Sequence, residues 1–62
     1  MFKVFEIYDE NNRKVFETKE IICLPEKEHI NLMLLNRYKI KIDEKVATKK
    51  TINELYSSIK KG

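Results

Sequence analysis

The sequence predicts one small α+β domain, in which a three-stranded antiparallel-type sheet carries two helices on one face. Residues 2–8 are rich in aromatic and β-branched types, residues 38–42 alternate strictly between apolar and polar, and residues 51–61 carry an apolar stripe at helical spacing. A chain of 62 residues is long enough for a single domain, so residues 1–62 are expected to fold as one unit. The expected element order is β-β-α-β-α.

A β-hairpin is expected from residues 2–8 and residues 14–23. The two asparagines at residues 11–12 lie between these segments, and asparagine tolerates the positive φ that a tight turn requires. A turn centred there sets up these cross-strand pairs: Asp9 with Lys14, Ile7 with Phe16, Glu6 with Glu17, Phe5 with Thr18 and Lys3 with Glu20. The alternative is a slip of one residue, which would pair Tyr8 with Phe16 and lose the favourable pairs.

Pro25 is expected to end the second strand, because proline cannot donate a hydrogen bond to a strand ladder. Residues 26–36 are mostly good helix formers, and Glu26 and Glu28 lie where the dipole at a helix N-terminus favours negative charge. A helix is therefore predicted over 26–36. A strand that begins near Ile30 is the alternative.

The second half of the chain is predicted to add a third strand and a second helix. Residues 38–42 form the strand. Residues 46–47 either extend this strand or form a loop. Thr51 and Glu54 have the spacing of a capping box, so the last helix is expected to run over 51–61. The side chains expected to face the core are Tyr38, Ile40 and Ile42 from the strand and Ile52, Leu55, Tyr56 and Ile59 from the helix.

Residues that carry chemistry are few. Gly62 is the only glycine, which excludes a glycine-rich phosphate-binding loop, and Cys23 and His29 are the only soft metal ligands. Cys23 follows an apolar run, so it is expected to be a buried structural thiol. Two spacings remain, Ser57 with Lys60 and Glu26 with His29, but each lacks the further groups that its enzyme or di-metal class requires. We therefore expect no catalytic residue, no metal ligand and no cofactor.

The first strand is apolar on both sides, which is unusual for a strand that has one face in water. One side holds Phe5 and Ile7, and the other holds Phe2, Val4 and Tyr8. The second set is predicted to contact a protein, either a second copy in a homodimer or a different partner. A domain of about 60 residues has a marginal core and gains stability from such contacts.

Basic residues gather in the second half of the chain. Residues 1–31 hold five Lys/Arg and seven Asp/Glu, whereas residues 32–62 hold eight Lys/Arg and three Asp/Glu, for a net charge of +3 overall. The basic positions expected to contact an acidic protein surface or a nucleic acid are Arg37, Lys39, Lys41, Lys45, Lys49 and Lys50. The alternative interpretation is that these lysines prevent an exposed strand edge from pairing with another chain and keep the protein soluble.

These patterns favour a non-enzymatic binding module: a small regulator, adaptor or inhibitor of another protein, comparable by analogy to small phage or mobile-element proteins. A nucleic-acid-binding regulator that uses Arg37, Lys39 and Lys41 is the second hypothesis, and an enzyme or metal-bearing subunit is the third. No apolar run reaches the roughly 20 residues that a membrane span needs, and the single cysteine suits the cytoplasm.

Overall fold

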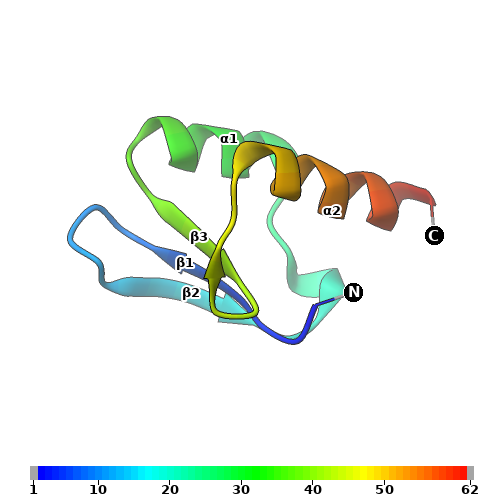
Figure 1. The fold of residues 1–62 in the computed structure, drawn as a ribbon, viewed down its shortest axis with the longest axis horizontal. Coiled ribbons are helices and arrows are strands. Elements are labelled where there is room, and N and C mark those ends of the chain that lie inside the picture. The colour runs from blue at the N-terminus through cyan, green and yellow to red at the C-terminus, as the bar shows by residue number, and fades with distance from the viewer. Residues whose placement is uncertain (1, 62) are drawn as a thin grey trace.

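The computed structural model describes the backbone of residues 2–61 and the side chains of residues 2–59. The elements follow in the order β1 (Phe5–Tyr8), β2 (Lys14–Thr18), the short 3-10 helix η1 (Ile21–Cys23), α1 (Lys27–Leu35), β3 (Lys39–Ile42), β4 (Lys45–Val46) and α2 (Lys49–Lys61). Both α-helices lie over one face of the sheet, and the opposite face is uncovered (Figure 1). The predicted α+β class and the two helices on one face are confirmed.

The sheet has four antiparallel strands in the order β2-β1-β3-β4, so the prediction of three strands was wrong. The fourth strand forms because Asp43 and Glu44 adopt φ angles of 52° and 68° and fold the chain back on itself. A two-residue hairpin with a type I′ turn needs positive φ at both central positions, and its usual marker is Asn-Gly or Asp-Gly. The sequence has neither at this point.

The β1–β2 hairpin follows most of the predicted pairing. Its register pairs Phe5 with Thr18, Glu6 with Glu17 and Ile7 with Phe16, as expected. A β-bulge then shifts the register between Ile7 and Tyr8, so Tyr8 lies opposite Lys14 and the predicted pair of Asp9 with Lys14 was wrong. Val15 is the extra residue on β2. The side chains of β2 therefore do not alternate regularly between the two faces of the sheet all the way to the turn.

Both hairpin strands are shorter than predicted. β1 starts at Phe5 rather than Phe2, and β2 ends at Thr18 rather than Cys23, so Lys3 and Glu20 lie outside the ladder. The Thr18 hydroxyl accepts a hydrogen bond from the Glu20 backbone N–H at 3.1 Å. A threonine side chain that bonds to nearby backbone offers it an alternative to the strand ladder, and the chain turns into η1.

Five side chains without measurable exposure form the centre of the core. Phe5, Ile7 and Ile40 come from the inner face of the sheet, Ile30 from α1 and Ile52 from α2. The alternation in β3 and the apolar stripe of α2 are therefore confirmed. The helix over 27–35 excludes the alternative of a strand starting near Ile30.

α2 begins two residues before the predicted start. The Thr51 backbone N–H donates to the Thr48 hydroxyl at 3.2 Å, and the Ile52 N–H donates to the Thr48 carbonyl at 3.0 Å. Thr48 is therefore the N-cap, and the predicted capping box of Thr51 with Glu54 was wrong. Since threonines stand at both 48 and 51, the sequence offers two caps, and the structure uses the first.

α1 ends in a left-handed residue. The Tyr38 N–H donates to the Met33 carbonyl at 3.0 Å, and the Arg37 N–H donates to the Leu34 carbonyl at 3.2 Å, which is the hydrogen-bond pattern of a Schellman motif. Arg37, with φ of 67°, takes the position that glycine usually occupies. The motif satisfies carbonyls at the end of the helix and fixes the direction in which the chain enters β3.

Tyr56 joins α2 to the segment that precedes α1. Its hydroxyl donates to the Pro25 carbonyl at 2.6 Å. Burial raises the pKa of Tyr56 from its ordinary value of 10.0 to about 12. The hydroxyl therefore stays protonated, and remains a donor, well into alkaline solution.

Replacing Tyr56 by phenylalanine removes this donor and leaves the Pro25 carbonyl without its partner. We expect the Tyr56→Phe substitution to lower the free energy of unfolding by about 1 kcal/mol at neutral pH, measured by urea denaturation. Tyr38→Phe is the matched control, because the Tyr38 hydroxyl donates to no described residue, and it should change the free energy by a few tenths of a kcal/mol.

The loss of stability at alkaline pH gives a separate measure of the burial of this hydroxyl. The folded state holds the Tyr56 proton more tightly than the unfolded state, so raising the pH favours unfolding between pH 10 and about 12. The Tyr56→Phe variant should lose less stability than the parent over that range. Equal losses in both proteins would show that the hydroxyl does not carry this dependence.

The left-handed residue Glu44 predicts a stabilising substitution. A side chain at positive φ costs about 1–2 kcal/mol, and glycine removes that cost while adding about 0.4–1 kcal/mol of unfolded-state entropy. We expect Glu44→Gly to raise the free energy of unfolding by about 0.5 kcal/mol in urea denaturation. Glu54→Gly, within α2, is the control and should lower it by about 1 kcal/mol.

Candidate functional site

The uncovered face of the sheet carries both salt bridges that the described residues form. The register places two rows of side chains across it. One row runs from β2 to β4 as Glu17, Glu6, Lys41 and Val46, and the other runs from β2 to β3 as Lys14, Tyr8 and Lys39. We call this surface, together with Val15 at the bulge, the open face.

Tyr8 lies near the middle of the open face and is held by two neighbours. Its hydroxyl donates to Glu6 Oε2 at 3.0 Å, and Lys41 Nζ lies 4.9 Å from the centroid of its ring. The hydrogen bond to the carboxylate raises the pKa of Tyr8, so the hydroxyl stays protonated at neutral pH. A cation over the ring adds a cation–π attraction. The aromatic side chain is therefore ordered although it faces solvent.

Lys14 offsets the repulsion between Glu6 and Glu17. Its Nζ lies 3.7 Å from Glu6 Oε2 and 2.5 Å from Glu17 Oε1. The hydrogen bond with Glu17 raises the pKa of Lys14 and lowers that of Glu17, so both stay charged at neutral pH. Glu6 is only 9% exposed, and a carboxylate that is so withdrawn from water needs the partners that Lys14 and Tyr8 supply.

The bulge places Lys14 where this ion pairing is feasible. In the predicted register Lys14 would pair with Asp9, two residues from Ile7 and Phe16, and would therefore share their inward face. The extra residue Val15 moves Lys14 opposite Tyr8, on the open face. The like-charge pair that the sequence predicts is confirmed, and the bulge supplies the compensation that the sequence does not reveal.

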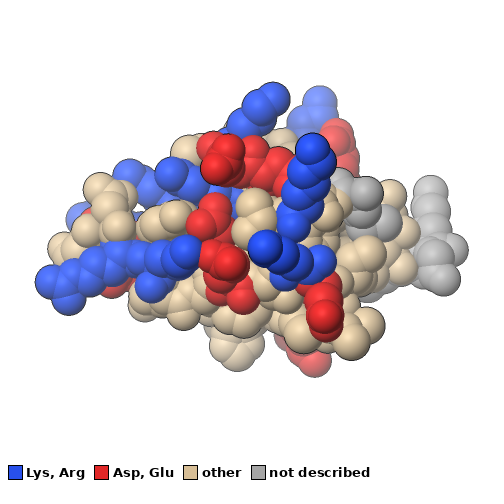
Figure 2. Space-filling view, turned by 90° about the horizontal axis from the view of Figure 1, so that it is seen from below, with Lys and Arg blue, Asp and Glu red and all other residues tan. Residues whose placement is uncertain are grey.

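The open face therefore mixes both charge signs. Figure 2 views the molecule from the uncovered side of the sheet and shows acidic and basic side chains interleaved, with residues of other types between them. Val15 on one edge strand and Val46 on the other are 51% and 63% exposed. The centre is polar and ordered, and each rim has an exposed apolar side chain.

The structure separates the three residues predicted to form an apolar interface. Phe2 packs against the core, with its ring 6.1 Å from that of Phe5. Val4 is held beside the β3–β4 turn, where its N–H donates to Asp43 Oδ1 at 3.0 Å and its carbonyl accepts from the Asp43 N–H at 2.9 Å. The N–H groups of Val4 and Lys3, which both donate to Asp43 Oδ1, lower the pKa of Asp43. Of the three, Tyr8 lies at the centre of the open face.

The predicted basic residues also lie in different places. Lys39 and Lys41 are on the open face, next to its acids, whereas Arg37 ends α1. Lys45 is paired with Ile42, which faces the helices. The last two, Lys49 and Lys50, belong to the first turn of α2, in the layer on the other side of the sheet.

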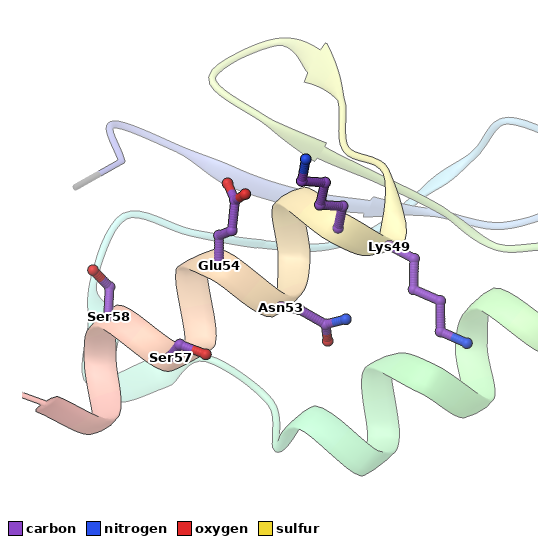
Figure 3. Close-up of a pocket in the computed structure, with 6 residues that line it drawn as sticks. Lys49, Asn53, Glu54, Ser57 and Ser58 are labelled. Atoms are coloured by element: carbon purple, nitrogen blue, oxygen red, sulfur yellow. The ribbon is translucent and has the colours of Figure 1, made fainter.

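A shallow groove runs along the outer surface of α2. Lys49, Lys50, Asn53, Glu54, Ser57 and Ser58 line it. Figure 3 shows Lys49 directed toward α1, while Glu54 projects on the side of the sheet. All of these residues come from one helix, so the groove is a polar helix surface and not a cleft between elements.

Cys23 is exposed, so the prediction of a buried thiol was wrong. It lies in η1 because the chain leaves the sheet after Thr18, and its Sγ is 3.7 Å from Glu20 Oε2. His29 is exposed on α1. Within the described residues, no cluster of three or more His, Cys, Asp or Glu side chains is placed to hold a metal ion. Nor is either helix, over the same residues, long and apolar enough to cross a membrane.

Comparison of the chain with protein families, with curated proteins and with solved structures found no match. The functional argument therefore depends on the geometry of the open face and of the helices.

The coupling between Glu6 and Tyr8 can be tested by titration. Replacing Glu6 by glutamine weakens the hydrogen bond that the phenol donates and removes the negative charge beside it, so the pKa of Tyr8 should fall toward its ordinary value of 10.0. The ring resonances of Tyr8, followed by NMR against pH, measure this directly. Glu17→Gln is the control: Glu17 makes no hydrogen bond to Tyr8, so the pKa should move less. An unchanged value in Glu6→Gln would contradict the assigned hydrogen bond.

Proposed function

We propose that this chain is a non-enzymatic binding module that acts on another protein, as a regulator, adaptor or inhibitor, through its open face. The observation that carries the proposal is the position of Tyr8, an aromatic side chain fixed between Glu6 and Lys41 on a sheet face that no helix covers. The residues used are those of the open face rather than Phe2 and Val4.

An ordered tyrosine suits the centre of a protein interface. Tyrosine is enriched among the residues that contribute most to binding, because it offers a large amphipathic surface and loses few rotamers when it is covered. Tyr8 has already lost part of that freedom through its contacts with Glu6 and Lys41. The exposed Val15 and Val46 add apolar contact area at the two rims.

The charge pattern supports a protein partner over a nucleic acid. A phosphate backbone is uniformly negative, so it is repelled by the half of the open face that holds Glu6 and Glu17. A folded protein can place basic groups over that half and acidic groups over Lys39 and Lys41. The acidic partner surface expected from the sequence corresponds, in this proposal, to the part that covers β3.

The experiment is capture from the native cytosol by the tagged chain, with and without nuclease, followed by mass spectrometry and an affinity measurement with the purified partner. One stoichiometric protein that persists after nuclease is expected. Tyr8→Ala should weaken its binding by about 2 kcal/mol, which is roughly 30-fold in dissociation constant. Lys41→Glu should also weaken binding, because it reverses the charge beside Tyr8.

Lys50→Glu is the matched control, since it makes the same charge change on α2 and should leave binding unchanged. Circular dichroism establishes that each variant is folded. Enrichment that disappears with nuclease would replace the proposal by nucleic-acid binding. Equal loss of binding in Lys41→Glu and Lys50→Glu would show that total charge, and not the open face, governs recognition.

A further inference from the structure

α1 is apolar on its outer side as well as its inner side. Ile30 is buried, and Met33 and Leu34 pack against the core. On the other side, Leu32 and Leu35 are 57% and 79% exposed. They are three residues apart and therefore neighbours on the helix surface. α1 therefore carries apolar side chains on two opposite sides, and its polar residues, such as His29 and Asn31, lie between them.

Charge changes sign along this outer side. Glu28 is exposed one turn before Leu32, at a spacing that places it on the same face. Arg37 is exposed two residues after Leu35, and the two line one shallow hollow together with Glu10, Asn36 and Tyr38. Neither side chain forms an ion pair with any side chain that the structure describes. The surface is thus acidic at one end, apolar in the middle and basic at the other, and we call it the α1 strip.

We infer that the α1 strip binds the α1 strip of a second copy, with the two helices antiparallel. A two-fold axis through the apolar middle places Leu32 of one copy against Leu35 of the other, because a symmetric interface uses the same patch twice. The same axis brings Glu28 of each copy to Arg37 of the other. The axis passes midway between Leu32 and Leu35. Along the sequence, the midpoint between Glu28 and Arg37 lies only one residue from that point, so the two charged residues also come together across the axis.

The size of the strip sets the strength of the association. A helix of nine residues is about 13 Å long at 1.5 Å per residue, so the interface belongs to the small class that forms reversibly. This inference is independent of the proposed function, since the open face lies on the opposite side of the sheet from α1 (Figure 1).

Sedimentation equilibrium from about 10 μM to about 1 mM measures the association. The mass should rise above the 7.5 kDa of one chain toward twice that value as concentration increases. Leu35→Ser should weaken dimerisation by about tenfold or more, because each dimer loses two apolar contacts. Val46→Ser is the matched control on the open face and should leave the mass curve unchanged. A parent chain that stays monomeric throughout, or equal effects of the two variants, would overturn the inference.

Charge exchange tests the antiparallel arrangement. Glu28→Arg and Arg37→Glu should each weaken dimerisation by about fivefold, because each places like charges together at both ends of the interface. An equimolar mixture of the two variants restores opposite charges at both ends, so it should associate more strongly than either variant alone. A mixture no stronger than its components would overturn the arrangement. The Leu35→Ser variant should still capture a partner protein at the level of the parent chain. A failure of the dimer can therefore be distinguished from a failure of the proposed function.

Discussion

The β-bulge opposite Ile7 and Tyr8 inserts Val15 into β2, and the side-chain pattern of the sheet depends on it. Beyond the bulge Lys14 lies on the open face, where it reaches both Glu6 and Glu17. Without the extra residue it would share the inward face of Ile7, and the two carboxylates would be adjacent with no cation between them. An insertion of one residue thereby turns an unfavourable cross-strand pair into a network that also orders Tyr8.

The β1–β2 turn, the C-terminal end of α1 and the β3–β4 hairpin depend on a second constraint, which is how a chain with a single glycine makes sharp turns. Among the described residues, four take up the left-handed conformation instead: Asn12, Arg37, Asp43 and Glu44. Asparagine and aspartate tolerate it because their side chains are short and polar. The Asp9 carboxylate holds the turn around Asn12 by accepting from the Asn11 and Arg13 N–H groups, and the Asp43 carboxylate accepts from the N–H groups of Lys3 and Val4. Arg37 and Glu44 have no such compensation. Their conformations are maintained by the helix cap and the strand pairing around them.

Burial patterns were predictable from the sequence because they repeat. The alternation around Ile40 and the helical spacing of Ile52 and Tyr56 each recur over several residues, so both core-facing surfaces were correctly expected. Features that depend on a single residue were not predictable from the sequence. The bulge at Val15, the hairpin through Glu44 and the choice of Thr48 as the cap each result from competition between local alternatives of similar energy, which tertiary contacts decide. The open face could not be derived for this reason, since its arrangement depends on the bulge.

The strand order has a consequence for how the chain folds. β1 lies between β2, its neighbour in sequence, and β3, which belongs to the second half of the chain. The β1–β2 hairpin can form locally and early, but an isolated two-stranded hairpin is marginal in water. Pairing Phe5 with Ile42 closes a loop that includes η1 and α1, and Tyr56 then ties α2 to Pro25. Neither half of the chain holds a complete sheet or core, so folding should be a single cooperative step whose nucleus draws on both halves.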